Sequence, residues 1–234
     1  MLLLAAGEGR RVGGETNKVL LPLAGLPVFA WSLRALREIE YVDQVVVVVR
    51  EADRHVVASS IGSHFAAMPI QVVAGGDTRH GSEWNALQAI ADLVDDGAID
   101  VVAIHDAARP LAGSALFREV IVAAAEHGGA LPVREQRHLL PREHPDSDDT
   151  RQQDSTLVAV QTPQAFRAQP LLDAYRRSRR DGFVGTDTAS CVEEYTDLEI
   201  RPVPCLATNL KITFPEDAAV AERLLHNATG AGAG

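Results

Sequence analysis

The chain's 234 residues can form one substantial hydrophobic core, and its 46% hydrophobic and 23% charged residues are ordinary for a globular protein. A formal net charge of −10 argues against binding to nucleic acid or membrane surfaces, because both usually need a basic face. The two cysteines, Cys191 and Cys205, show neither a disulfide framework nor metal-ligand spacing. No segment approaches the roughly 20 apolar residues of a membrane span. We therefore expect a cytoplasmic protein with reduced thiols and no nucleic-acid or membrane partner.

Three apolar runs are continuous rather than alternating, which is typical of strands buried on both faces. They cover Leu2–Ala5, Gln44–Val49 and Val101–Asp106. Helical patterns accompany them at Phe29–Ile39, Ser82–Val94 and Ser114–Gly128, with Ser82 and Ser114 as candidate N-caps. The alternation predicts an α/β fold with a doubly wound, mostly parallel sheet. Ligands of such sheets bind at the carboxyl ends of the strands.

The loop AAGEGRR follows the first strand and has the composition of a phosphate-binding turn. Gly7 and Gly9 let backbone N–H groups approach phosphate oxygens closely. Arg11 can bind two oxygens with its planar guanidinium, and Lys18 adds a mobile charge. The spacing fits neither the dinucleotide fingerprint G-x-G-x-x-G nor a Walker A loop. A plain strand–helix turn with surface cations is the alternative, but the cations at this spacing favour phosphate.

A second glycine loop, GGDTRHGS, leads into the next helical pattern. Gly75 and Gly76 would let the backbone pack against a flat ring, and Ser82 can hydrogen-bond a base or simply cap the helix.

The segment IHDAARP ends the third strand with Asp106. A carboxylate at this edge of a central strand, near a polyphosphate, is well placed to hold Mg²⁺ directly or through water. Arg109 can face a second anion. A local ion pair between Asp106 and Arg109 is the simpler alternative.

Two later motifs, TDTAS at 186–190 and NLKITFPED at 209–217, also carry polar chemistry. Lys211 lies in a short strand-like run, where a cation needs an anionic partner. The segment PED reads as a helix start, with proline in the first turn and acids that complement the helix dipole. The histidines show no metal-cluster spacing, and no G-x-S-x-G elbow indicates a nucleophile.

From about residue 132 to residue 160 the sequence is polar and lacks a helical period, which indicates an excursion from the core such as a hairpin arm. The end of the chain, NATGAGAG, has the composition of a flexible tail. We therefore expect a single domain over residues 1–228 that includes this protruding arm, followed by a flexible tail over 229–234.

The motifs described above, together with TPQAF at 162–166, occur in the order typical of one family. From Leu3 to about Leu225 the chain resembles the 2-C-methyl-D-erythritol 4-phosphate cytidylyltransferases, which have a Rossmann-like nucleotidyltransferase fold. The first glycine motif is shared by many sugar-phosphate nucleotidyltransferases, whereas HDAARP followed by TPQ and NLKIT-PED is much more specific. Enzymes that act on ribitol 5-phosphate are also similar.

The resemblance implies a reaction in which CTP and a polyol phosphate give a CDP-polyol and pyrophosphate, with Mg²⁺ as cofactor. It implies three catalytic cations, Arg11, Lys18 and Lys211. The positions that match its nucleotide-binding residues are Ala5, Ala6, Gly7, Gly9, Gly75, Gly76, Ser82 and Ala107. The acceptor-side positions are Asp106, Arg109 and Thr162. It also implies a homodimer in which each arm reaches into the partner's site.

The chain departs from the family pattern mainly on the acceptor side. Gln136 replaces an arm threonine and Asp154 replaces an arginine, both of which usually meet the acceptor phosphate. Asn17 stands where proline precedes the lysine, and Thr208 stands where aspartate is common. Arg134, Arg137 or Arg151 could supply substitute charge. The identity of the acceptor therefore stays open.

Three hypotheses about the function follow from the sequence. The leading one is a cytidylyltransferase for methylerythritol phosphate, and the second is a related transferase for another polyol phosphate or a phosphonate. The third is a non-catalytic nucleotide-binding protein, against which Arg11, Lys18 and Lys211 argue, since binding alone does not need all three. A Rossmann oxidoreductase fits worst, because its glycine spacing and ribose-binding acid are missing.

Overall fold

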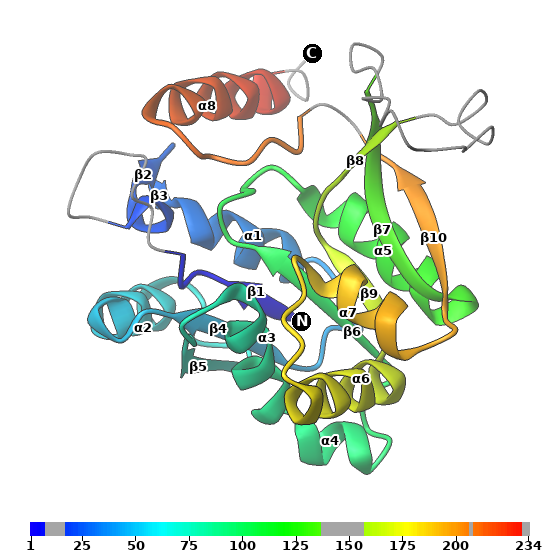
Figure 1. The fold of residues 1–234 in the computed structure, drawn as a ribbon. Coiled ribbons are helices and arrows are strands. Elements are labelled where there is room, and N and C mark those ends of the chain that lie inside the picture. Colours follow the sequence, from blue (N-terminus) through cyan, green and yellow to red (C-terminus); the bar gives the residue numbers. More distant parts are fainter. Residues whose placement is uncertain (8–16, 137–156, 206–207, 231–234) are drawn as a thin grey trace, which may run out of the picture.

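A mixed eight-stranded sheet with helices on both faces forms the protein, as seen in a computed structural model that describes residues 1–7, 17–136, 157–205 and 208–230 (Figure 1). The strands of this sheet are β1 (Leu2–Leu4), β4 (Val45–Val49), β5 (Ile70–Ala74), β6 (Val101–Asp106), β7 (Gly128–Glu135), β8 (Val158–Val160), β9 (Gln164–Arg167) and β10 (Glu199–Pro204). A separate small ribbon pairs β2 (Pro22–Leu23) with β3 (Leu26–Pro27).

The helices vary from single turns to four turns in length. The α-helices are α1 (Val28–Leu36), α2 (Arg54–His64), α3 (Arg79–Gln88), α4 (Ala91–Asp95), α5 (Gly113–His127), α6 (Ala168–Asp181), α7 (Thr188–Tyr195) and α8 (Pro215–Gly230). The 3-10 turns are η2 (Lys18–Leu20) and η3 (Glu51–Asp53). No described helix combines the length and apolar character that a membrane crossing requires.

The strand order is β10-β7-β9-β6-β1-β4-β5, with β8 paired to β7. β1 pairs in parallel with β4 and β6, and β4 pairs in parallel with β5. β9 runs antiparallel between β6 and β7, while β10 is parallel to β7. The structure therefore confirms the mostly parallel sheet, and the three strands predicted from continuous apolar runs are β1, β4 and β6.

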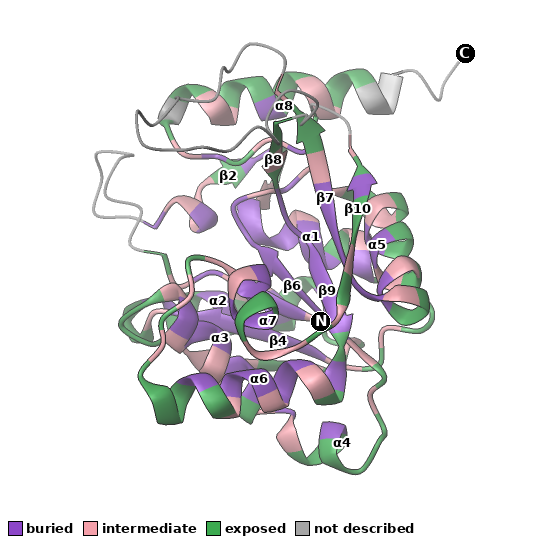
Figure 2. Cartoon of the chain, turned by 45° about the vertical axis from the view of Figure 1, so that its right-hand side comes forward, coloured by how far each residue is buried: buried purple, intermediate pink, exposed green. Residues whose placement is uncertain are grey.

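The central strands are buried on both faces because each alternates its side chains between two cores. All five valines of β4 are fully buried. Val46 and Val48 join Leu2 in a core against α3 and α6, whereas Val45 and Val47 join a core against α1 and α2. Figure 2 shows this continuous buried sheet between partly exposed helices.

Two predicted helix starts are wrong. The helix expected over Ser82–Val94 is two helices, α3 and α4, and the cap of α3 is Thr78, whose hydroxyl accepts from the Gly81 N–H at 2.9 Å. The cap expected at Ser114 is absent, because α5 begins one residue earlier at Gly113 and the Ser114 hydroxyl donates to Glu38 instead. In both cases the serine hydroxyl bonds to a group outside its helix instead of capping it, Ser82 to Gly76 and Ser114 to Glu38.

The helix start predicted at PED is confirmed, since α8 begins at Pro215. A carboxylate oxygen of Asp217 accepts from the backbone N–H groups of Thr213 and Phe214 at 2.7 and 2.8 Å, which satisfies donors at the start of the helix. The helix includes residues 229 and 230 of the expected tail, and residues 231–234 lie outside the described residues.

The predicted arm begins as an antiparallel pair of β7 and β8 in the register Val133 with Val160 and Glu135 with Val158. Residues 137–156, which include Arg137, Arg151 and Asp154, lie outside the described residues. The arm and its role therefore stay a prediction.

Gly129 of β7 gives a test of the packing between the antiparallel strands. A Cβ at this position would lie 2.7 Å from the ring of Phe166, which is fully buried on β9. We expect Gly129→Ala to lower the free energy of unfolding by about 1–3 kcal/mol, because the buried ring has no space to move into. Urea unfolding monitored by circular dichroism measures this change.

Gly62→Ala is the matched control, since Gly62 is exposed on α2 with open space around its Cβ position. It should raise the stability by about 0.5–1 kcal/mol through helix propensity. An equal response of the two variants would contradict the packing argument.

Candidate active site

A cavity of about 750 Å³ lies at the carboxyl edge of the four parallel strands β1, β4, β5 and β6. Each strand contributes its last residue or the one that follows, namely Leu4, Arg50, Gly75 and Asp106. This is the edge at which doubly wound sheets bind ligands. The two loops singled out in the sequence, AAG and GGDTRHGS, therefore line the same cavity.

Cations dominate the lining of this cavity. Lys18, Arg50, Arg79 and Lys211 outnumber the carboxylates Asp77 and Asp106. The excess of positive charge is local, because the whole chain carries a formal charge of −10. Only two of its 22 basic residues are lysines, and both line the cavity. Such a site favours a multiply charged anion.

Asp106 is the central anion of the site. Its two oxygens accept from different cations, Oδ1 from Arg79 at 2.5 Å and Oδ2 from Lys211 at 2.7 Å. Burial raises the pKa of Asp106, but the charges of Arg79 and Lys211 outweigh burial and hold the pKa well below its usual range. The carboxylate is therefore ionised, and it fixes two cations at the cavity wall.

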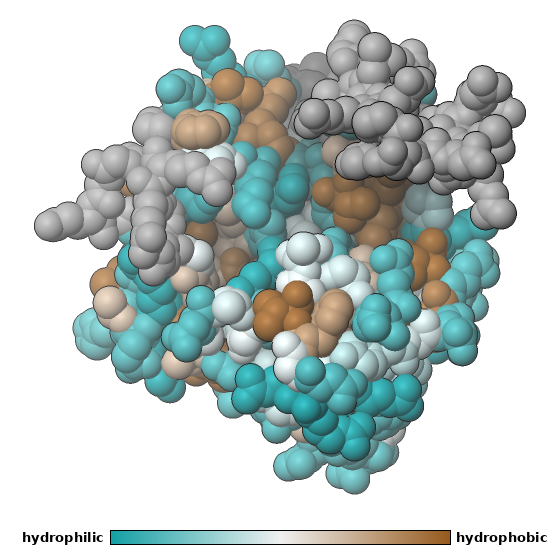
Figure 3. Space-filling view, in the orientation of Figure 1, coloured by the Kyte–Doolittle hydropathy of each residue, from teal (hydrophilic) through white to brown (hydrophobic). Residues whose placement is uncertain are grey.

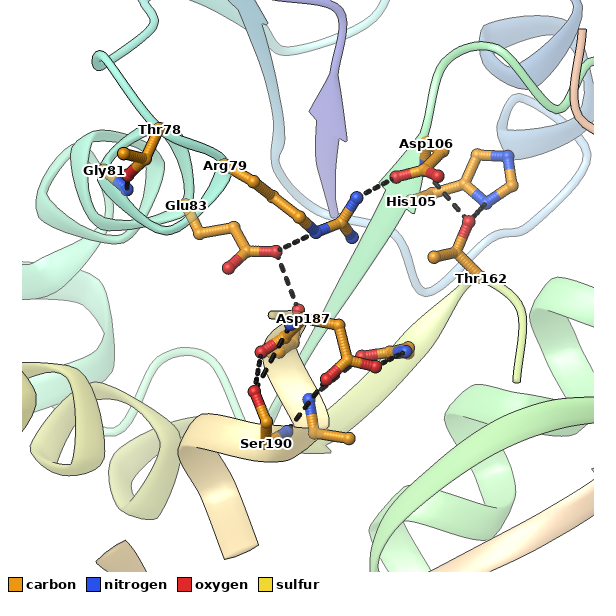
Figure 4. A network of polar contacts seen from close by, with 12 residues as sticks. Thr78, Arg79, Gly81, Glu83, His105, Asp106, Thr162, Asp187 and Ser190 are labelled. Carbon is orange, nitrogen blue, oxygen red and sulfur yellow. Dashed lines mark hydrogen bonds and ion pairs between the residues drawn. The ribbon is translucent and has the colours of Figure 1, made fainter. Parts of the chain in front are cut away.

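A second buried carboxylate, Glu83 of α3, also forms an ion pair with Arg79. Arg79 Nε lies 3.0 Å from Glu83 Oε1, so one guanidinium spans two carboxylates (Figure 4). Glu83 also accepts from the hydroxyls of Tyr175 and Thr188 at 2.5 and 3.0 Å. Burial raises the pKa of Glu83 despite Arg79 and these two donors. The network joins α3, α6 and α7 to the end of β6.

The glycine loop after β5 is packed too tightly for side chains. A Cβ on Gly75 would lie 2.5 Å from Cβ of Ala6, and one on Gly76 would lie 2.7 Å from the backbone carbon of Gly81. Ser82 Oγ accepts from the Gly76 N–H at 3.1 Å. Ser82 therefore stabilises the loop instead of capping the helix, and the loop presents its backbone to the cavity.

The turn that carries Lys18 is anchored by Asn17, which is almost completely buried. The Asn17 side-chain amide donates to the carbonyl of Ala5 at 3.0 Å and to Asp53 at 2.8 Å. Asp53 also accepts both Arg50 Nε and Nη2, at 2.7 and 2.9 Å. This departure from the family's proline thus ties the Lys18 turn to β1 and to Arg50.

A buried polar cluster that does not line the cavity supports the end of β6. Thr162 Oγ1 accepts from the Asp106 N–H at 3.0 Å and contacts His105 Nδ1 at 3.1 Å. Burial lowers the pKa of His105 to about 4, so this imidazole is neutral at physiological pH. Arg109 Nη1 donates to the carbonyl of Asn209 at 2.8 Å, and Arg109 Nε lies 4.0 Å from Asp106.

The structure brings together most of the residues chosen from the sequence. Those that line the cavity are Ala6, Gly7, Lys18, Gly75, Gly76, Ser82, Asp106 and Lys211. Ala5, Ala107, Arg109 and Thr162 lie beside these residues but do not line the cavity. Gly9 and Arg11 lie outside the described residues.

One expectation about Lys211 needs correction. Its segment is not a strand, although the Ile212 N–H donates to the carbonyl of Ala108 at 2.8 Å, and the Lys211 side chain is 41% exposed. The anionic partner expected for this lysine is Asp106.

Sequence reasoning missed Arg50, Arg79 and Glu83. Arg79 lies within the motif GGDTRHGS, two residues after Asp77. The motif does not predict that Arg79 pairs with Glu83 and Asp106. Arg50 follows the valine run of β4 directly, which is itself the signal for a residue at a ligand-binding edge.

A metal at this site would take few protein ligands. Among the described residues, no group of three or more His, Cys, Asp or Glu could hold a metal ion. Asp106 fits as one such ligand, since it is ionised and faces the cavity, and Mg²⁺ is often held by one carboxylate together with substrate phosphates and waters.

The doubly wound sheet and the cationic, glycine-walled cavity at its carboxyl edge place the chain in the class of α/β nucleotidyltransferases. The family model described as 2-C-methyl-D-erythritol 4-phosphate cytidylyltransferase matches residues 1–227. The chain belongs to this family.

Relatives and solved structures agree with this membership. The 2-C-methyl-D-erythritol 4-phosphate cytidylyltransferase of Symbiobacterium thermophilum is 37% identical over 226 residues, which cover 96% of this chain and 92% of the relative. That of Rhodopirellula baltica is 36% identical and covers 97% and 94%. The crystal structure of the Thermus thermophilus enzyme aligns with a TM-score of 0.69 at 25% identity, covering 97% and 98%. A synthase structure from Anaerococcus prevotii shares the fold with a TM-score of 0.80 at 24% identity, covering 96% and 94%.

Substitution of Tyr175 tests the buried network formed by Arg79, Glu83 and the Tyr175 hydroxyl. We expect Tyr175→Phe to lower the free energy of unfolding by about 2 kcal/mol, because it leaves a buried carboxylate with one donor fewer. The ring and its stacking on His80, at 4.6 Å between centroids, are retained. Urea unfolding measures the loss.

Tyr41→Phe is the matched control, because Tyr41 is 48% exposed. It should leave the unfolding midpoint unchanged. If Tyr175→Phe had the same unfolding midpoint as this control, the Tyr175 hydroxyl would make no contribution to the stability of the network.

Proposed function

We propose that this chain transfers the cytidylyl group of CTP to 2-C-methyl-D-erythritol 4-phosphate and releases pyrophosphate. The observation that carries the proposal is the pair of lysines and the bridged Arg79 that converge on one cavity at the strand ends. Family membership supports the substrates, since the relatives are named for them. The proposed enzyme is a single domain over residues 1–228.

The reaction needs cations more than it needs a base. The acceptor phosphate is already an anion, and it would attack the α-phosphorus of CTP in line as the bond to pyrophosphate breaks. Its repulsion from the triphosphate is the barrier that positive charge must lower. Lys18 and Lys211, which both line the cavity, are proposed as two of these cations, and Arg11, which lies outside the described residues, is proposed as the third.

Asp106 and Glu83 would keep this charge in place. Lys211 is held by Asp106, and Arg79 is held by both carboxylates, so neither cation has to be ordered during the reaction. Pre-ordered charge costs no reorganisation in the transition state. Arg79 is thus proposed as a residue that holds phosphate oxygens or orients Lys211 through Asp106.

The glycine loop would recognise the base. Gly75 and Gly76 present backbone next to Ala6, and a flat ring needs such a surface without Cβ atoms. Gly7 and Gly9 would bind the triphosphate through their N–H groups, with Ala5 and Ala107 beside the nucleotide.

Mg²⁺ is proposed as the cofactor, held by Asp106 together with the phosphates of CTP. When bound, it would neutralise charge on the triphosphate and favour departure of pyrophosphate.

Thr162 and Arg109 are proposed acceptor-side residues, and in this structure both support the end of β6. Gln136, at the start of the arm, donates its backbone N–H to Leu157 at 2.8 Å. A homodimer through the arm is proposed as the source of the remaining acceptor contacts.

Pyrophosphate release from CTP and Mg²⁺ tests the proposal, with methylerythritol phosphate, ribitol 5-phosphate and a phosphonate analogue as acceptors. Fastest turnover with methylerythritol phosphate supports the assignment. Preference for another acceptor would keep the cytidylyltransferase and replace its substrate. Binding of CTP without release under any acceptor would indicate a protein that binds nucleotide without turnover.

Lys18 should act mainly in the transition state. We expect Lys18→Ala to lower kcat by about 100-fold or more, as for loss of one preorganised stabilising group, with a much smaller effect on CTP affinity. Steady-state kinetics and calorimetric CTP titration measure the two quantities. Arg54→Ala is the control, because Arg54 is an exposed cation of α2 that pairs with Glu51. Equal losses in kcat and affinity would make Lys18 a ground-state anchor.

Asp106 should govern the metal requirement. We expect Asp106→Asn to raise the Mg²⁺ concentration for half-maximal rate, because the carboxylate that would hold the ion is gone. Asp77→Asn is the matched control, since Asp77 also lines the cavity but lies on the glycine loop. A metal dependence that is the same in both variants would exclude Asp106 as a ligand.

A further inference from the structure

A second hollow, of about 590 Å³, lies between Trp84 of α3 and the second half of α6. Trp84, Asp173 and four arginines line it, namely Arg176, Arg177, Arg179 and Arg180. Figure 3 shows a strongly hydrophilic surface along the lower part of the molecule, where α6 lies in Figure 1. The hollow shares no lining residue with the catalytic cavity.

Internal contacts account for only part of this positive charge. Arg176 pairs with Asp95 at 2.6 Å and with Asp173 at 3.3 Å. Arg177 donates to the carbonyl of Tyr195 at 3.2 Å. Among the described residues no carboxylate lies within ion-pair distance of Arg177, Arg179 or Arg180.

The arrangement is unfavourable for an isolated helix. Like charges three and four residues apart on one helix repel each other, and Arg176, Arg177, Arg179 and Arg180 contain three such pairs. The helix dipole favours Arg179 and Arg180 in the last turn, but it does not act on the other two to the same extent. A bound anion would remove the repulsion.

Trp84 gives the hollow an apolar wall. The guanidinium carbon of Arg179 lies 5.8 Å from the centre of the Trp84 ring, within range of a cation–π contact that orders the arginine. Guanidinium groups match the oxygens of phosphate with two parallel hydrogen bonds.

We propose that the hollow between α3 and α6 binds a small phosphate-bearing anion through Arg177, Arg179 and Arg180. This site is separate from the cavity proposed for CTP and does not rest on the function proposed there. It adjoins the same helices, because Trp84 follows Glu83 on α3 and Tyr175 precedes Arg176 on α6.

Tryptophan fluorescence tests the proposal directly. The chain has two tryptophans, so a full-length Trp31→Phe variant reports on Trp84 alone. We expect a saturable change in its emission on titration with inorganic tripolyphosphate at constant ionic strength. Adding Arg177→Gln and Arg180→Gln should weaken binding by about tenfold or more, since hydrogen bonds to charged groups are lost. Adding Arg201→Gln, an exposed arginine of β10, should leave the affinity unchanged.

Two further experiments separate the possible sources of the fluorescence signal. Lys211→Gln should leave the change in Trp84 emission unaffected. If this variant no longer gave the change, the signal would come from the catalytic cavity and the proposal would be overturned. An oligoglutamate of equal charge should bind more weakly than tripolyphosphate, and an equal response would assign the hollow to acidic polypeptides instead. No saturable response would also overturn the proposal. If Trp31→Phe fails to fold, 19F-labelled tryptophan in the otherwise unaltered chain gives the same readout.

Discussion

The carboxylate of Asp106 joins the parts of this protein that matter for its chemistry. It stands at the end of β6, where its backbone N–H is held by Thr162, and its two oxygens hold cations from distant parts of the chain. Arg79 comes from α3 and Lys211 from the segment before α8, so one buried anion positions both walls of the cavity. The negative charge of Asp106 offsets the repulsion between these two cations.

This dependence explains why so much buried polarity surrounds the site. Asp106 orders Arg79, Arg79 is ordered again by Glu83, and Glu83 is in turn satisfied by Tyr175 and Thr188. A buried charge network is stable only when each member has its partners. The helices α6 and α7 therefore contribute to the site although neither lines the cavity. They act by keeping α3 and its arginine in place.

Much of the fold could be predicted from the sequence, because the valines of β4 and the apolar run of β6 read as central strands without ambiguity. Helix starts were less predictable. Ser82 and Ser114 are good caps by local rules, yet one locks a glycine loop and the other binds Glu38, and only the tertiary structure decides between such uses. The antiparallel insertion of β9 had no local signal either, since pairing order depends on distant segments.

The site shows the same division. Glycines and cations at strand ends are visible as motifs, and Lys18, Lys211 and Asp106 do meet in one cavity. The partners of these residues are not visible, because they are separated by up to 105 positions in the chain, as between Asp106 and Lys211. Asn17 is the clearest case. As a substitution for proline it looks mild, but the structure gives its side-chain amide two buried acceptors.

The scarcity of lysine in this chain has a chemical consequence. Because arginine supplies all other basic side chains, the cavity contains the only ε-amino groups of the protein. A reagent that acylates such amines or forms an imine with them can modify the α-amino group of Met1 but no other ε-amino group, so labelling of the two lysines reports occupancy of this cavity. A protease that cuts only after lysine likewise has two positions available, and both line the cavity. Protection of both by a bound nucleotide would map the ligand without any substitution in the chain.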